Sequence, residues 1–163
     1  MLGDIQDVKH AIARQLLGGD FLTTLAAVDA EKAVAIATPG PTQVFEGEKA
    51  QISDQGYPVV EVIGNRTIYD TASEQAKAAT HEIQIVWTHV GDDELTITAQ
   101  LERLVRATVD YFWPPTGSMV LMGVNAAPLT LLSEEYTALL PTRTAGQFVK
   151  GSAITLHVPT FRL

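Results

Sequence analysis

The sequence predicts an α+β fold, in which a mainly antiparallel sheet of about four or more strands packs against a long helix and an N-terminal helix. Several segments alternate between apolar and polar residues, which is typical of strands with one buried face. A helical pattern runs without a break over residues 94–112. The predicted order is strand, strand, helix, strand, strand, and strands grouped in this way favour an antiparallel sheet with helices on one face. At 163 residues the chain is most simply one domain spanning residues 1–163.

Two helices, or a helix and a further short element, are expected before residue 38. Asp4 begins the first helix, and Gly18-Gly19 ends it. Its apolar residues have helical spacing: Ile5, Val8, Ile12 and Leu16. Residues 20–37 begin with helical spacing as well, whereas residues 32–36 fit either a helix or a short strand. The sequence Pro39-Gly40-Pro41 then breaks the chain.

Two strands and two long polar connections are expected between residues 41 and 79. A short strand at residues 42–45 lies within the first connection, which covers residues 41–55. Residues 57–64 form the clearer strand, because they are rich in β-branched side chains and end at Gly64. Residues 65–79 form the second connection. Loops longer than about 12–15 residues are uncommon in compact domains, and they indicate function, disorder or contact with a partner.

Residues 80–113 contain the strand and the helix around which the predicted fold is organised. The strand alternates over residues 82–88, with Ile83, Ile85 and Trp87 on the face that is expected to be buried. Asp92 is the expected N-cap of the helix, and the acidic residues 93 and 94 suit its first turn. One stripe of the helix is predicted to lie in the core: Ile97, Leu101, Leu104, Val105, Thr108 and Phe112.

The opposite face of this helix is expected to be polar and solvated: Gln100, Glu102, Arg103, Arg106 and Asp110. On that face Glu102 and Arg106, and Arg106 and Asp110, have the i,i+4 spacing that adds roughly 0.2–0.5 kcal/mol per pair. Trp87 is expected in the core, whereas Trp113 at the helix end is expected to anchor a contact with another subunit.

The C-terminal part of the chain predicts more strands. An apolar run at residues 118–125 and residues 128–132 are both expected to be extended. Residues 133–136 are predicted to form a turn or a single helical turn. Residues 148–159 alternate again, which predicts a closing strand.

Composition excludes several classes of function. The chain has no cysteine, so disulfides, thiolate metal sites and cysteine nucleophiles are absent. A net charge of −8 argues against a broad grip on nucleic acid, which needs clustered Lys and Arg. A membrane span is not expected, because no apolar run approaches about 18 residues. A secretory signal is not expected either, because the first twenty residues contain Asp4, Asp7, Lys9, His10 and Arg14. Hydrophobic residues make up 46% and charged residues 18% of the chain, which predicts that neighbouring subunits cover some of its surface.

The sequence predicts no catalytic, cofactor-binding or metal-binding residue. Four histidines stand at positions 10, 81, 89 and 157. His81 and His89 share a strand face but lie about 26 Å apart, so they cannot share a metal. The acidic run at residues 92–94 is explained as a helix N-terminus. A Gly-x-Ser-x-Gly motif and a phosphate-binding glycine loop are both missing, since Gly18-Gly19 ends a helix and does not lead into a phosphate site.

The order of these elements resembles a known family. The likeness rests on the Tyr-Pro strand at residues 57–62, the strand at residues 81–87, the acidic turn and long helix, and the closing strand at residues 148–158. Together with part of the first helix, they are similar to the tail terminator and tail completion proteins of long-tailed bacteriophages. The segment 33–55 is longer than in a typical compact member of that family.

The resemblance implies a structural subunit without enzymatic activity that forms a ring, usually a hexamer, at the end of the tail tube. Such a ring halts tube polymerisation, so its expected partners are its own copies, the tail tube protein and the head–tail connector or neck protein. DNA would pass through the lumen without specific binding, which suits an acidic chain because a basic wall would hold the phosphates. No cofactor or membrane is implied, and the expected location is the virion tail or neck after assembly in the host cytoplasm.

Two alternatives stay open at this point. One is another head–tail joining ring of the same neck. The other is a small soluble enzyme or ligand-binding α+β domain.

Overall fold

The computed structural model describes residues 3–48, 56–70, 77–114, 121, 124 and 128–162. Within these residues the chain has the predicted α+β fold, with three helices and a six-stranded, mostly antiparallel sheet. In chain order the elements are α1 Ile5–Leu16, α2 Gly19–Lys32, β1 Gln43–Phe45, β2 Val59–Asp70, β3 Lys77–Gly91, α3 Glu94–Phe112, β4 Thr130–Tyr136, β5 Leu140–Pro141 and β6 Phe148–Arg162. The strand order is β1-β2-β3-β6-β4, and β5 pairs with the start of β6. Only the β1–β2 pair is parallel.

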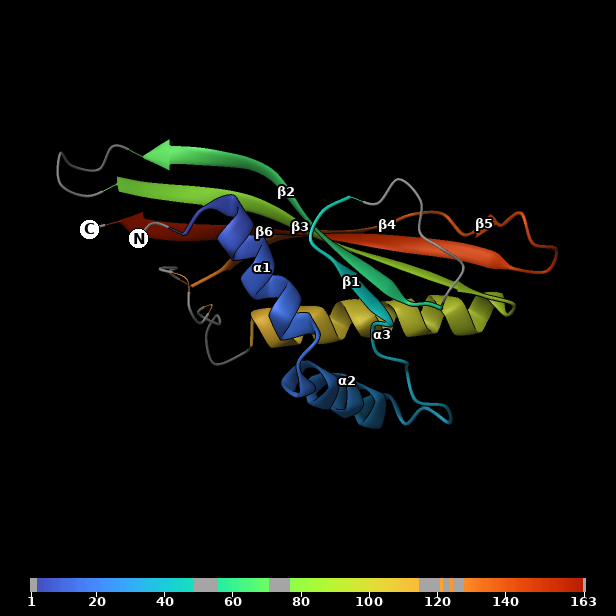
Figure 1. The fold of residues 1–163 in the computed structure, drawn as a ribbon. Helices are drawn as coiled ribbons and strands as arrows, with labels where there is room; N and C mark the ends of the chain where they lie inside the picture. The colour runs from blue at the N-terminus through green and yellow to red at the C-terminus, as the bar shows by residue number, and fades with distance from the viewer. Residues whose placement is uncertain are drawn as a thin grey trace.

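The described helices cover one face of the sheet (Figure 1). The long helix α3 runs along that face, α1 crosses it, and α2 packs against α3 on the side away from the strands. Buried and half-buried residues alternate along β3 and β6, which explains this arrangement. On the face toward the helices, Ile83, Ile85 and Trp87 of β3 are buried. Their partners on β6 are buried as well: Leu156, Ile154 and Ser152. The alternate residues face away from the helices and are half-buried.

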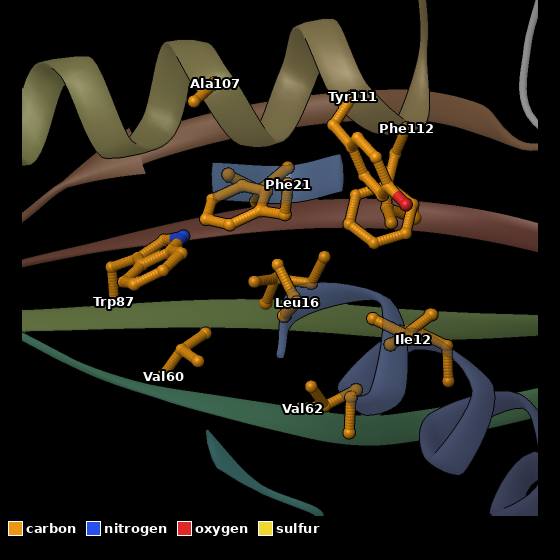
Figure 2. Packing of buried hydrophobic residues seen from close by; sticks show 14 of the residues in the cluster. Ile12, Leu16, Phe21, Val60, Val62, Trp87, Ala107, Tyr111 and Phe112 are labelled. Carbon is orange, nitrogen blue, oxygen red and sulfur yellow. The ribbon is translucent and has the colours of Figure 1, made fainter. Parts of the chain in front are cut away.

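The core lies between this sheet face and the helices (Figure 2). The predicted α3 stripe is confirmed, because all six of its residues are buried. Phe21 of α2 stacks on Trp87, with 5.9 Å between ring centroids, and meets Tyr111 of α3 edge to face. The indole N–H of Trp87 donates to Thr108 Oγ1 at 3.0 Å, and that hydroxyl donates to the Leu104 carbonyl. The one hydroxyl in the stripe therefore brings no unsatisfied polar group into the core.

The helix ends follow local chemistry, with one correction. Asp4 begins α1 as predicted, and its side chain accepts the Asp7 N–H while the Asp7 carboxylate accepts the Asp4 N–H. The N-cap of α3 is Asp93, so the prediction of Asp92 is wrong by one residue. The Asp93 carboxylate accepts the hydroxyl of Thr96 and no backbone N–H, and this contact helps to place the cap one position later.

The predicted second connection, residues 65–79, is wrong. β2 continues to Asp70 and β3 begins at Lys77, so most of this stretch is strand. Gly64, predicted to end the strand, lies inside β2 next to a bulge at Gly64/Arg66. A Cβ added at Gly64 would lie 2.6 Å from Ile5 Cδ1. The glycine therefore lies where the Ile5 side chain of α1 packs close to the strand, and a side chain at this position would require Ile5 to move.

Three other predictions meet the structure differently. Residues 133–136 are part of β4, so the predicted turn is wrong. Residues 32–36 contain no strand, because α2 ends at Lys32 and Ala33 adopts the left-handed conformation with φ 50°. Of the predicted extended run 118–125, only Leu121 and Val124 are among the described residues. Residues 49–55 of the predicted first connection also lie outside the described residues. The short strand β1 and the closing strand β6 are confirmed.

Candidate functional site

The four histidines lie apart from one another and have separate roles. His81 and His89 both point from β3 toward the helices and are buried, whereas His157 lies on the opposite face of the sheet and His10 on α1. His81 joins three segments: Nδ1 lies 2.9 Å from Thr67 Oγ1, and Nε2 lies 3.0 Å from the Gly3 carbonyl and 3.1 Å from Thr160 Oγ1. The ring therefore ties the N-terminal segment to β2 and β6.

His89 lies at the other end of β3, under the first half of α3. It is 5% exposed, and its Nε2 lies 2.7 Å from Gln100 Oε1, so Nε2–H donates to the amide oxygen. Within the part of the chain that the structure describes, His89 Nδ1 and Ser152 Oγ have no hydrogen-bond partner. Burial lowers the pKa of His89 from its ordinary value of 6.5, and the Gln100 hydrogen bond opposes that shift.

A pH dependence of stability follows from His89. Because its pKa is lower in the folded than in the unfolded chain, folding binds fewer protons, and stability falls as the pH decreases below about 6.5. We expect His89→Gln to flatten this part of the stability curve, measured as the urea midpoint between about pH 7 and 5. The wild type, measured over the same pH range, provides the reference slope. An unchanged slope in His89→Gln would remove His89 as the source.

The acidic run at residues 92–94 lies at the N-terminus of α3. Asp93 caps α3 and Glu94 lies in its first turn, where negative charge is favourable. Among the described residues, no group of three or more histidine, aspartate or glutamate side chains is arranged to hold a metal ion.

A shallow hollow opens between α2 and α3. Its volume is about 350 Å³, and it is lined by Val28, Lys32, Val34, Ala99, Glu102, Arg103 and Arg106. A second hollow of about 340 Å³ adjoins it over Val34, Ile36 and Leu95. The two arginines are already paired, because Arg103 Nη1 lies 3.3 Å from Asp29 Oδ1 and Arg106 Nε lies 2.8 Å from Asp110 Oδ2.

Arg103 departs from its predicted solvated position. Its side chain and that of Asp29 are each only 11% exposed. Asp29 also accepts the Thr38 N–H and the Thr38 hydroxyl, each at 2.6 Å, so this buried network joins α2, α3 and the chain after α2. The Arg106–Asp110 pair is present as predicted, and Arg106 also lies 3.6 Å from Glu31.

The second face of the sheet is not covered by a described helix, and it is mostly polar or small. Positions on it include Thr80, Glu82, Gln84, Thr88, Ala153, Thr155 and His157. At its centre Glu82 Oε2 lies 2.9 Å from Arg66 Nη2 and 3.3 Å from His157 Nε2. The hydrogen bond from His157, and to a smaller extent the one from Arg66, lowers the pKa of Glu82, so this carboxylate stays ionised.

Large apolar side chains are exposed at both edges of the sheet. Ile68 and Tyr69 are exposed at the end of β2, and Phe161 at the end of β6. Leu132 and Tyr136 are exposed on β4, with Leu140 on β5. Trp113, predicted to anchor a subunit contact, is exposed as well. Apolar side chains gathered in this way are typical of surfaces that bind other proteins.

No protein family model matches the sequence, and no curated protein matches it. Among solved structures, one similar chain belongs to the virion of a native gene transfer agent particle. It has 16% sequence identity and a TM-score of 0.43, and the alignment covers 83% of this chain and 93% of that chain.

None of the described helices combines the length and the apolarity that crossing a membrane requires.

Two features of the structure were not predicted from the sequence: the hydrogen-bonded network of Asp29, Arg103 and Thr38, and the two edges of the sheet. A signal for the first was available, because Asp29 directly follows Val28, which continues the helical apolar spacing of Leu22 and Leu25. For the second, the run Thr67-Ile68-Tyr69 has the β-branched and aromatic composition of a strand.

Proposed function

We propose that this chain is a structural virion protein that assembles into a ring, and that the ring is the tail terminator that caps the tail tube. The observation that carries the proposal is the distribution of its surfaces. Helices cover one face of the sheet, while apolar side chains are exposed at both sheet edges. A subunit with contact surfaces on two opposite sides suits a ring, because a ring needs two different surfaces that meet.

The uncovered sheet face suits the lumen of such a ring. Among its described residues, Arg66 is the only Lys or Arg, and it is paired with Glu82. The same face carries the further exposed acidic residues Asp70 and Glu135. Phosphates are held by clustered basic side chains, so this surface would let DNA slide past without specific binding.

The second candidate is another head–tail joining ring of the neck, which would use the same two-sided subunit. A ligand-binding or enzymatic role has less support. The hollow between α2 and α3 holds basic side chains, but Arg103 and Arg106 are each engaged by a carboxylate.

Native mass spectrometry of the purified protein tests the ring. We expect a closed oligomer, with six copies as the leading expectation, or a concentration-dependent equilibrium that approaches it. A strict monomer that turns over a substrate would contradict the proposal.

Polymerisation of the tail tube protein then separates the two kinds of ring. A terminator should stop tube growth when added in excess, whereas a neck ring should leave tube growth unchanged and bind the connector. An unrelated acidic protein of similar size serves as the control for nonspecific effects.

A further inference from the structure

Among the residues that the structure describes, the sheet has an unpaired edge on each side. β1 pairs only with residues 59–61 of β2, so residues 66–70 of β2 have no described strand on their outer side. The outer side of β4 also has no described strand. Such an edge presents backbone N–H and C=O groups that can pair with a strand of another chain. We call residues 66–70 the β2 edge and residues 130–136 the β4 edge.

The two edges are complementary in side-chain type. Both expose large apolar residues, Ile68 and Tyr69 on the β2 edge and Leu132 and Tyr136 on the β4 edge. Their charged residues differ: the β2 edge carries Arg66, which also pairs with Glu82 of its own copy, and Asp70, whereas the β4 edge carries Glu134 and Glu135. Exposed edges of monomeric proteins are usually protected by charges or prolines at the pairing positions, and apolar residues there favour association.

Direction fits pairing between successive copies in a ring. β2, β3, β6 and β4 are neighbours in that order and each pair is antiparallel, so β4 runs opposite to β2. Rotation about a ring axis that lies roughly along the strands does not reverse a strand. The β4 edge of one copy would therefore meet the β2 edge of the next in antiparallel orientation. Neither strand has to change its direction within its own subunit.

The offset between the edges also fits a closed ring. The β4 edge lies beside residues 152–157 of β6, whereas the β2 edge, through β3, lies level with residues 157–161. Measured along the strands, the centres of the two edges differ by about four to five residues, or about 15 Å. Measured across the strands, the four strands of one copy span about 19 Å. Joining them requires a strand tilt of about 40°, within the 35–45° typical of closed sheets.

Symmetric pairing of two β4 edges fits less well, because with their centres opposed Leu132 meets Glu134 and Leu131 meets Glu135. Two β2 edges would place Ile68 opposite Ile68 and Arg66 opposite Asp70, an arrangement that the single variant Ile68→Cys would report as a dimer. When the centres of the β2 and β4 edges are opposed, Tyr69 meets Leu132 and Arg66 meets Glu135.

We propose that the β4 edge of one copy adds in antiparallel orientation to the β2 edge of the next copy, so that the ring is closed by one continuous sheet. This inference rests on the proposed ring function and names the partner of these edges, a second copy of the chain. The uncovered, acidic faces of the sheets then join into one surface around the lumen.

Disulfide trapping tests this interface, because the chain has no cysteine of its own. In the variant Tyr69→Cys/Leu132→Cys, β3 and β6 separate the two positions within one copy, a distance of about 14 Å. A disulfide needs Cα atoms within about 7 Å, so only two copies can form it. Under mild oxidation we expect a ladder of covalent multiples on a non-reducing gel, ending at the ring size. The pair Leu17→Cys/Leu132→Cys, with exposed Leu17 at the end of α1, is the control and should give no ladder.

Each outcome decides between the two proposals. A ladder from the Tyr69/Leu132 pair alone supports the inference. Rings in native mass spectrometry without this ladder, or dimers from either single cysteine variant, overturn the edge pairing and leave the ring function standing. Monomers at every concentration overturn both.

A charge reversal provides a second measurement that does not depend on cysteine chemistry. Arg66→Glu should raise the protein concentration at half-assembly by at least about tenfold, because it places a carboxylate opposite Glu135 of the next copy. Adding Glu135→Arg to that variant should restore assembly. If Arg66→Glu assembles like the wild type, the edge pairing is wrong.

Discussion

Leu104→Ala is expected to lower the free energy of unfolding by about 2–5 kcal/mol. Leu104 has no exposed surface and lies on the α3 stripe that faces the sheet. Truncation removes the apolar contacts of the side chain and leaves a cavity that the long helix cannot easily close, since it is packed between β3, β6 and α2. Urea denaturation followed by tryptophan fluorescence would measure the change, because Trp87 lies in the same core.

Leu95→Ala on the same helix is the matched control. Leu95 is 82% exposed, so the same chemical change should alter stability by no more than about 0.5 kcal/mol. The difference between the two variants reports which face of α3 is buried, independently of helix propensity. A loss below about 1 kcal/mol for Leu104→Ala would mean that the helix face is assigned wrongly.

The elements that could be predicted from the sequence are those buried on one side. β3, β6 and α3 each bury one face, and the resulting period of two or of about 3.6 residues can be recognised in a single sequence. β4 is an edge strand that is exposed over most of its length, so it lacks this alternation, and residues 133–136 therefore resemble a turn.

Contacts between distant residues explain the other differences. Gly64 resembles a strand end because glycine usually weakens strands, but here it makes room for Ile5, which lies far away in the sequence. Arg103 has the spacing of a solvated residue on α3, and its partner Asp29 is 74 positions away. The pairing of β2, β3, β6 and β4, which creates the two open edges, likewise depends on contacts that periodicity does not contain.

Asp29→Ala is expected to destabilise the protein by about 3–5 kcal/mol, because it leaves a buried positive charge without its partner. Arg103 would keep only the hydrogen bond from Nε to the Ala99 carbonyl, at 3.1 Å. The Thr38 N–H and hydroxyl would lose their acceptor as well, so the chain that follows α2 would no longer be tied to it. Chemical denaturation of the variant and the wild type measures the loss.

Asp110→Ala is the control for this effect. It also removes an aspartate that pairs with an arginine of α3, but the Arg106 side chain is 46% exposed, and such pairs contribute about 0–1 kcal/mol. Equal losses in Asp29→Ala and Asp110→Ala would contradict the view that burial makes the Asp29 pair important.

The double variant Asp29→Ala/Arg103→Met separates the buried charge from the packing. Met keeps much of the apolar stem of arginine and has no charge, so the penalty of an unpaired guanidinium disappears. We therefore expect the double variant to be more stable than Asp29→Ala alone, although it carries one more substitution. The effects of the two substitutions would then not add, as is usual for residues in direct contact. If they do add, Arg103 does not depend on Asp29, and the loss in Asp29→Ala must come from the Thr38 hydrogen bonds, which Thr38→Val would reproduce in part.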